Sequence, residues 1–254
     1  MATRHTNDRV WCSTIPIVRR KIVVLLGAIT VSVSACASTR ANSLQGKDPD
    51  SILSQSLRTA VKFAGVHYVL RTTNGGQSQM VTGDAGTTIG AQSTVVGSDE
   101  TVVEMVGTTA FLRGNAGGLQ NIIGWASGPA SRYAGTWISL RPTDSLYQTV
   151  VQGVTLSTLL AQLSPVSPLI ESSPGTVAGQ QVVGVRGDLR SSPGQGEATF
   201  WVATSPPNVP VGIDAQATGK NTTVTEVGVF TKWGERFRLR APSGAVPFSS
   251  LATP

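Results

Sequence analysis

The sequence predicts an α+β protein in which strands predominate. Residues 48–64 repeat their apolar positions at helical spacing, whereas many shorter stretches alternate apolar and polar residues with a period of two. Short turns separate these shorter stretches, so neighbouring strands are expected to be antiparallel. The chain is 40% hydrophobic, 13% charged and contains 28 glycines, a composition typical of a folded, strand-rich protein and not of a disordered one.

The first expected element is a helix that begins at Asp48. Asp48 is a candidate N-cap, and Pro49 suits the first helical position because it has no N–H that needs a partner there. Apolar residues then recur with a helical period up to Ala64, and Gly65 is predicted to end the helix.

Strand periodicity follows directly. After residues 66–71, the turn Asn74-Gly75-Gly76 leads into a second strand that runs through Thr82. Further strands are predicted at residues 91–96, 101–106 and 109–113. The turns between them are too short for parallel crossovers, so these strands form an antiparallel meander.

The middle of the chain changes character. Residues 115–124 and 129–135 indicate short helices or irregular loops, 136–140 a strand, and 144–151 and 155–163 helices. Thr155 is a candidate cap for the last helix, which Pro165 and Pro168 are expected to stop. Strands return at residues 180–189, 197–204, 211–217, 222–231 and 237–240. No linker after Gly46 is long enough to separate two domains, so residues 47–254 are predicted to form one.

The N-terminal region has the pattern of a secretory signal. Arg19-Arg20-Lys21 precede an apolar run at residues 22–35. As a helix this run is about 21 Å long, too short for a hydrocarbon core of about 30 Å. It therefore fits the apolar core of a signal peptide better than a membrane span.

The run ends in Val33-Ser34-Ala35-Cys36, which resembles the bacterial lipobox. The resemblance implies a signal peptide at residues 1–35, an S-diacylglycerol group and an N-acyl group (palmitate is typical) on Cys36, and a flexible tether at residues 36–46. It places the protein on the extracytoplasmic face of the cell membrane. Two alternatives remain: an ordinary secretory signal with an incidental cysteine, or an uncleaved helix that extends to about residue 41.

Most of the excess positive charge belongs to the predicted leader. The chain has 20 basic and 14 acidic residues, but five of the basic and one of the acidic residues precede Ile22. The mature chain would keep 15 and 13, too weak a positive charge to imply nucleic-acid binding. Cleavage would also remove Cys12, leaving a mature domain with no free thiol and no disulfide.

Several short motifs resemble the LppX/LprG lipoproteins of mycobacteria, whose fold is related to that of the LolA and LolB carriers. They are "FAGVHYVLRT", "YAGTWISL", "EATFWVAT" and "FTKWGERFRLRAP". The resemblance covers nearly all of the mature chain. It implies a curved antiparallel sheet, a half-barrel, with helices that cover its concave face and a lipid or glycolipid in an apolar cavity between them.

This fold suggests roles for two groups of residues. Trp125, Trp137 and Trp201 are candidates for lining the cavity, although single aromatic residues are more often part of a core. Gly83, Gly90 and Gly97 would permit the sheet to curve. The alternative function is a structural or protein-interaction lipoprotein with a filled core and no ligand; the sequence identifies no protein partner.

The mature chain offers little for catalysis, so we expect a protein that is not an enzyme and needs no metal or cofactor. His67 lies in a predicted strand without metal-ligand spacing around it. Ser127 lacks the spacing of a nucleophile elbow, and Asp99-Glu100 fit a solvated turn.

The C-terminal strand predicted at residues 237–240 belongs to a basic segment. Its alternation places Arg236, Arg238 and Arg240 on one face and Phe237 and Leu239 on the other. It is read either as a solvated outer strand or as a basic strip that faces anionic lipid headgroups.

Overall fold

The computed structural model describes residues 44, 46–190, 195–219 and 222–251. These all belong to the second of the two units into which the chain divides, Met1–Thr39 and Arg40–Pro254. The predicted signal peptide, Cys36 and most of the tether therefore lie outside the described residues and stay predictions.

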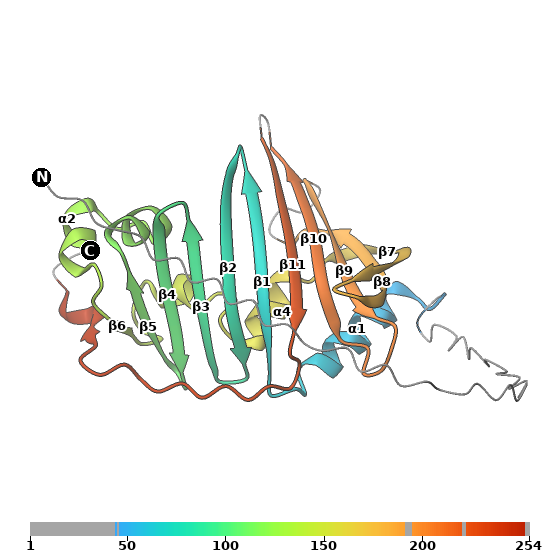
Figure 1. Cartoon of the computed structure of the whole chain (residues 1–254), viewed down its shortest axis with the longest axis horizontal. Coiled ribbons are helices and arrows are strands. Elements are labelled where there is room, and N and C mark those ends of the chain that lie inside the picture. The colour runs from blue at the N-terminus through green and yellow to red at the C-terminus, as the bar shows by residue number, and fades with distance from the viewer. Residues whose placement is uncertain (1–43, 45, 191–194, 220–221, 252–254) are drawn as a thin grey trace, which may run out of the picture. The chain divides into compact units, whose positions relative to one another are not determined.

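The described strands form one open, curved sheet of twelve strands in the order β12-β6-β5-β4-β3-β2-β1-β11-β10-β9-β8-β7 (Figure 1). Neighbouring strands are antiparallel except β12 and β6, which are parallel. The strands are β1 (Gly65–Asn74), β2 (Gln77–Gly86), β3 (Ile89–Val96), β4 (Asp99–Val106), β5 (Thr109–Gly114), β6 (Ile138–Leu140), β7 (Val166–Val177), β8 (Gln180–Asp188), β9 (Gly196–Ala203), β10 (Pro210–Thr218), β11 (Thr223–Thr231) and β12 (Val246–Pro247).

The sheet consists of two meanders that meet in its middle. Strands β1 to β6 follow one another on one side, and β7 to β11 follow one another on the other. The first and last long strands, β1 and β11, pair along eight residues, from His67 opposite Thr231 to Asn74 opposite Val224. We call this pairing the seam. After β11 the chain runs along one end of the strands of the first meander and reaches β6 through β12 (Figure 1).

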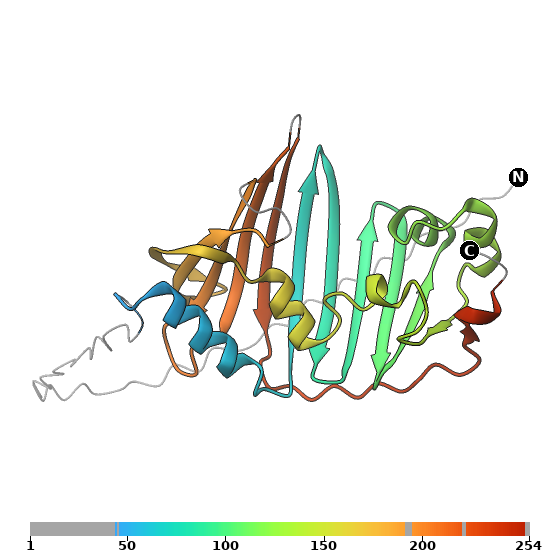
Figure 2. The same ribbon diagram turned by 180° about the vertical axis from the view of Figure 1, so that it is seen from behind.

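Helices lie on the concave face of this sheet (Figure 2). They are α1 (Pro49–Ala60), the π-helix η1 (Gly118–Ile122), α3 (Tyr147–Val150) and α4 (Leu156–Leu163). Two further helices, α2 (Ser127–Tyr133) and the 3-10 helix η2 (Phe248–Ser250), lie at the β6 edge of the sheet (Figures 1 and 2). The predicted half-barrel with helices over its concave face is therefore confirmed. Among the described helices, none combines the length and hydrophobicity that crossing a bilayer requires.

Two apolar clusters hold the helices against the sheet. The larger cluster joins α1 and α4 to the strands around the seam, with Tyr68, Phe200 and Phe230 fully buried at its centre. The second joins η1, α2 and α3 to β4, β5 and β6. Every member of both clusters lies between Leu44 and Leu251, so this part of the chain contains its own core and is expected to fold without the leader.

Helix α1 begins where the sequence predicts and ends earlier. The Asp48 carboxylate accepts a hydrogen bond from the backbone N–H of Ser51 at 2.9 Å, which makes it the N-cap. The helix stops at Ala60 instead of Gly65, because Phe63 leaves it to pack edge-on against Trp233 at 5.8 Å. Gly65 already pairs with Gly86 as the first residue of β1.

Two predictions about strands were wrong. Strand β7 was missed because Pro168 and Pro174 argue against a strand; it tolerates them as an edge strand with two register irregularities against β8. Conversely, residues 237–240 form no strand. They follow an extended path beside the ends of the sheet, where Phe237 packs over Gly65, whose missing side chain makes room for the ring.

Two of the three glycines expected to permit curvature, Gly83 and Gly90, instead allow close packing against the sheet. Gly83 lies under the ring of Tyr68, and Gly90 lies against the backbone carbonyl of Val154, so a side chain at either position would collide with its neighbour. Gly97 has φ +60° in the turn between β3 and β4, a conformation that favours glycine. Gly83 and Gly90 thus let the concave face be covered at close range.

Candidate functional site

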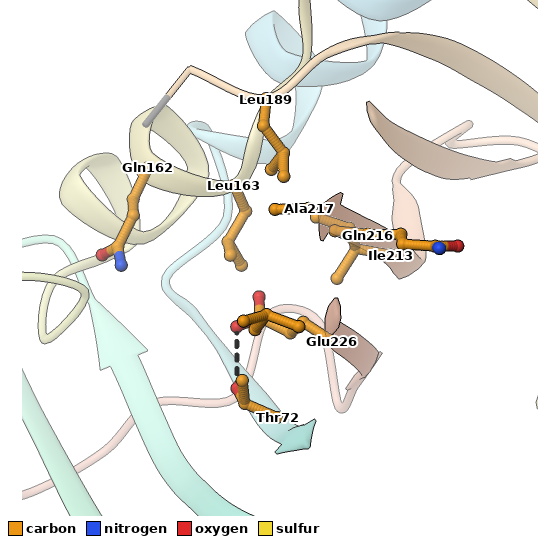
Figure 3. A pocket seen from close by; sticks show the side chains of 10 residues that line it. Thr72, Gln162, Leu163, Leu189, Ile213, Gln216, Ala217 and Glu226 are labelled. Atoms are coloured by element: carbon orange, nitrogen blue, oxygen red, sulfur yellow. Dashed lines mark hydrogen bonds between the residues drawn. The ribbon is translucent and has the colours of Figure 1, made fainter. Parts of the chain in front are cut away.

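The candidate site lies on the concave face at the seam. Thr72 of β1 and Glu226 of β11 are opposite each other in the ladder, and Ala215 of β10 is opposite Glu226 on its other side. Side chains along a strand alternate between the two faces of the sheet. Glu226 is four residues before the buried Phe230, so both side chains belong to the concave face. The last turn of α4 lies over this row and contributes Gln162 and Leu163 (Figure 3).

One cavity of about 280 Å³ opens beside Glu226 on the side of the second meander. Figure 3 shows Leu189 above this space, Leu163 and Ile213 on its two sides and Glu226 below it. Its lining is mainly aliphatic: Thr72, Gln162, Leu163, Leu189, Ile213, Ala215, Gln216, Ala217, Val224 and Glu226.

A second cavity, of about 290 Å³, lies under α3 and α4 on the side of the first meander. Its lining mixes seven aliphatic side chains with Glu226, Gly153 and eight side chains that carry an amide or a hydroxyl group: Thr72, Gln79, Gln92, Thr94, Thr101, Thr149, Gln152 and Gln162. Because Thr72, Gln162 and Glu226 line both cavities, the two spaces adjoin at this trio. The predicted cavity between sheet and helices is thus present. The sequence predicted an apolar cavity, but the lining is partly polar, because the strands of the first meander direct threonines and glutamines into it.

Glu226 is the charged group of this junction. The hydroxyl of Thr72 donates a hydrogen bond to its Oε2 at 3.0 Å. Burial raises the pKa of Glu226 above the ordinary value of a glutamate, and the Thr72 hydrogen bond lowers it by less. A carboxylate in this position is a hydrogen-bond acceptor held at a fixed place in a mostly uncharged cavity.

Tyr68 secures the covering segment to the sheet. From β1, its hydroxyl donates its proton to two neighbouring acceptors, Gln92 Oε1 at 2.8 Å and the backbone carbonyl of Gly153 at 3.1 Å. Gly153 belongs to the connection between α3 and α4. Burial raises the pKa of Tyr68, and the nearby charge of Asp84 raises it further, so this hydroxyl stays protonated and able to donate at physiological pH.

We expect Tyr68→Phe to lower the free energy of unfolding by about 1–3 kcal/mol, because the buried carbonyl of Gly153 loses its donor. Urea unfolding would measure this change. Tyr133→Phe is the matched control, since no hydrogen bond of the Tyr133 hydroxyl occurs within the described residues and little change is expected. Equal stability of the Tyr68→Phe variant and the wild type would contradict a role for this hydroxyl.

The structure places the three candidate tryptophans away from both cavities. Trp125 is buried in the second cluster and packs edge-on against Tyr133 at 6.2 Å. The guanidinium of Arg113 lies over the ring of Trp137, 4.8 Å from its centre. Trp201 lies over Gly184 on the convex face, where its Nε1–H donates to Asp214 at 2.6 Å. Neither cavity lining includes any of them.

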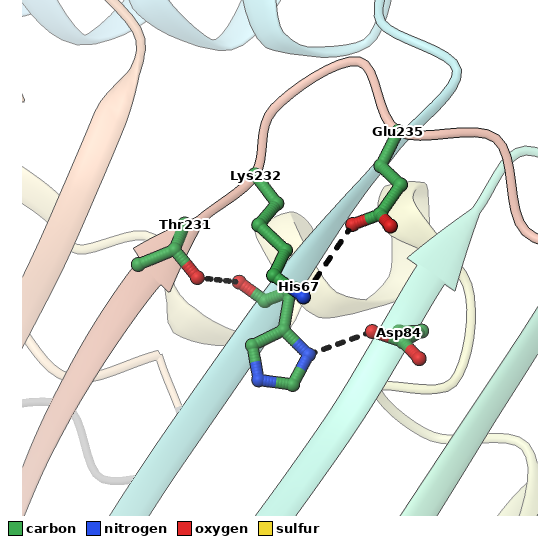
Figure 4. Close-up of polar contacts among 5 residues, drawn as sticks. All are labelled: His67, Asp84, Thr231, Lys232 and Glu235. Carbon is green, nitrogen blue, oxygen red and sulfur yellow. Dashed lines mark hydrogen bonds and ion pairs between the residues drawn. The ribbon is translucent and has the colours of Figure 1, made fainter.

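His67 forms a polar pair on the convex face. Its Nδ1 lies 2.7 Å from Oδ1 of Asp84 on β2, and the Lys232–Glu235 ion pair lies nearby (Figure 4). Ser127 begins α2 at the opposite end of the first meander, so it does not meet His67 (Figure 1). Within the described ranges, no group of three or more His, Cys, Asp or Glu residues is arranged to hold a metal ion.

The basic C-terminal segment keeps its predicted alternation without forming a strand. Arg236, Arg238 and Arg240 are exposed, whereas Phe237 and Leu239 are half-buried. Asp99 and Glu100, which were expected in a solvated turn, are instead the first two residues of β4, and Asp99 accepts a hydrogen bond from Asn121 at 2.7 Å. None of these residues lines either cavity.

Several solved structures are similar to this chain. Its structural neighbours include mycobacterial lipoproteins. LprF from Mycobacterium bovis is 14% identical with a TM-score of 0.47, covering 77% of this chain and 97% of its own. LppX from Mycobacterium tuberculosis is 15% identical with a TM-score of 0.46, covering 76% and 100%.

A LolA superfamily protein from Nitrosomonas europaea is also similar, at 10% identity and a TM-score of 0.31, covering 76% of this chain and 96% of its own. No model of a known protein family and no curated protein matches the sequence. The similarity to LppX-type lipoproteins inferred from short motifs is therefore confirmed as a similarity of structures.

Proposed function

We propose that this protein is a cell-envelope lipoprotein, anchored in the membrane through Cys36, that binds or carries a lipid or glycolipid between its sheet and its helices. The observation that supports binding is the pair of adjoining cavities at the seam. Each is about 280–290 Å³, and together they fall within the range of roughly 300–1,000 Å³ typical of small-molecule sites.

The two cavities differ in a way that suits an amphiphile. The aliphatic space beside Leu163, Leu189 and Ile213 would receive part of an acyl chain, since apolar surface gains free energy on leaving water. The space lined by glutamines and threonines would receive a polar headgroup, since these side chains both donate and accept hydrogen bonds. A ligand that crosses the junction beside Glu226 would use both.

The proposed anchor fits the geometry of the domain. Leu44, whose side chain is buried in the larger cluster, lies eight residues after Cys36. Eight residues span at most about 29 Å, so the domain would stay close to the bilayer surface. Two or three acyl chains on Cys36 would hold it there stably, whereas one chain binds only marginally.

Cys36→Ala is expected to abolish incorporation of radiolabelled fatty acid into the protein, and to leave either an unprocessed precursor or a soluble product. The reason is that acylation needs the thiol and cleavage follows acylation. Labelled cells, fractionated and immunoprecipitated, provide the measurement. Ala37→Ser, one residue further on, is the control and should be labelled like the wild type. Unchanged labelling of the Cys36→Ala variant would contradict the anchor.

Native mass spectrometry of the protein gently extracted from its own membranes tests the ligand. We expect a complex that is heavier than the acylated protein by the mass of one lipid, and this lipid should be bound without covalent attachment. A domain that is consistently empty and takes up no lipid on incubation would contradict carriage. That result would favour the alternative, a structural or protein-interaction lipoprotein; the small size of each cavity taken alone is the observation in its favour.

A further inference from the structure

Glu226 is the sole ionisable side chain among the described residues that line the two cavities. All other lining residues carry amides, hydroxyls or aliphatic groups, or are glycine. Charged residues of the neighbouring strands lie on the other face. Arg71 and Asp214 are each one position away from a residue opposite Glu226, so the alternation of side chains puts them on the convex face. A ligand in the adjoining cavities would therefore meet one charged group, and that group is acidic.

The position of this carboxylate is fixed by the backbone. Glu226 is opposite Thr72 in the seam, and the Thr72 hydroxyl holds its Oε2 at 3.0 Å. Within the described residues Oε1 has no hydrogen-bond partner, and Figure 3 shows the other carboxylate oxygen directed into the cavity beneath Leu163. One acceptor oxygen is thus left for a ligand at the place where the two cavities meet.

The surroundings indicate what that acceptor would bind. Gln162 shares the junction, and the amide and hydroxyl side chains of the second cavity continue from it. These polar side chains can satisfy a headgroup that carries several hydroxyl or amide groups, because each amide and each hydroxyl can both donate and accept hydrogen bonds. A phosphate or carboxylate headgroup would bring a second negative charge beside Glu226, with no basic side chain of the linings to compensate it.

We propose that Glu226 selects the headgroup of the lipid: its free oxygen accepts a hydrogen bond from an uncharged, hydroxyl-bearing headgroup and repels an anionic one. This inference rests on the proposed function. It names Glu226 as the residue that determines specificity and a neutral lipid with hydroxyl groups as the ligand class.

The test compares three lipids that share one acyl chain: 1-oleoylglycerol, 1-oleoyl lysophosphatidic acid and oleylamine. Their dissociation constants for the delipidated mature protein would be measured by native mass spectrometry at neutral pH. The wild type is expected to bind the neutral lipid at least tenfold more tightly than the anionic one. Glu226→Gln, which keeps the size of the side chain and removes its charge, should reduce this preference to less than threefold.

A control variant separates the loss of this carboxylate from the loss of any carboxylate. Glu235→Gln removes a carboxylate that pairs with Lys232 outside the cavities and should leave the preference unchanged. Thermal unfolding would confirm that each variant is folded.

Equal binding of the neutral and anionic lipids by the wild type would overturn the inference while leaving lipid binding intact. An unchanged preference in Glu226→Gln, or its loss in Glu235→Gln, would assign the selection to another group. Tighter binding of oleylamine than of 1-oleoylglycerol would overturn the ligand class. If none of the lipids binds, the proposed function fails and the inference fails with it.

Discussion

Ala215→Trp is expected to weaken lipid binding at least tenfold. Ala215 lies on β10 opposite Glu226 and lines the aliphatic cavity, so an indole at this position would occupy the space proposed for the acyl chain. The measurement is the lipid-bound fraction in native mass spectra after incubation with 1-oleoylglycerol.

Val227→Trp is the matched control for this variant. Val227 follows Glu226 on β11 but is 54% exposed on the convex face, so the same bulky residue leaves the cavities unchanged. Lipid binding of the Val227→Trp variant should equal that of the wild type. Normal binding by a folded Ala215→Trp variant would show that the lipid lies elsewhere.

Phe230→Ala is expected to lower the free energy of unfolding by about 3–5 kcal/mol, the range for loss of a buried aromatic ring. Phe230 is fully buried at the seam, where its ring lies 6.0 Å from Phe200 and 6.5 Å from Trp233, and Tyr68 is its partner across the ladder. Its removal would leave a cavity between the two meanders.

Urea unfolding measures the Phe230→Ala effect, and Val227→Ala on the same strand should change stability by less than about 0.5 kcal/mol because its side chain is exposed. A similar change in both variants would contradict the central place of Phe230 in the core. The comparison is valid if both variants have the same m-value, the slope of the unfolding free energy against urea concentration. A changed m-value would indicate a change in the unfolded state and not only lost packing.

The sequence is informative about this fold wherever the signal is local. Asp48 followed by Pro49 marks the start of α1, and Thr155 marks the start of α4, because capping involves neighbouring residues only. The alternation at residues 66–71 is equally local and gives the inward face of β1. The predicted alternation of Arg236 to Arg240 is also present, although no neighbouring strand pairs with it there.

Local sequence patterns give a wrong prediction where a contact with a distant part of the chain determines the structure. Strand β7 contains Pro168 and Pro174, and only its place at the edge of the sheet makes them acceptable. Gly65 resembles a helix C-cap but is used for close contact with Phe237, which lies far along the chain. In each case the structure depends on a residue or strand that is distant in sequence, so the neighbouring residues do not predict it.

The site was missed for the same reason. Thr72 and Glu226 meet only through the register of β1 and β11, which no pattern in either strand specifies. One signal was present in the sequence: Glu226 is four residues before Phe230, and the alternation of side chains along a strand puts both on the same face. The aromatic residues that drew attention, Trp125, Trp137 and Trp201, instead pack against Tyr133, Arg113 and Asp214.

The seam has a consequence for how the protein reaches its native state. Most pairings in each meander join strands that are adjacent in sequence, whereas the hydrogen bond from Thr72 to Glu226 connects residues 154 positions apart. Contacts between distant parts of a chain form slowly, because a long loop must close before they can contribute stability. We therefore expect the two meanders to assemble first and to dock last, so that the two adjoining cavities at the seam form only in the final step of folding.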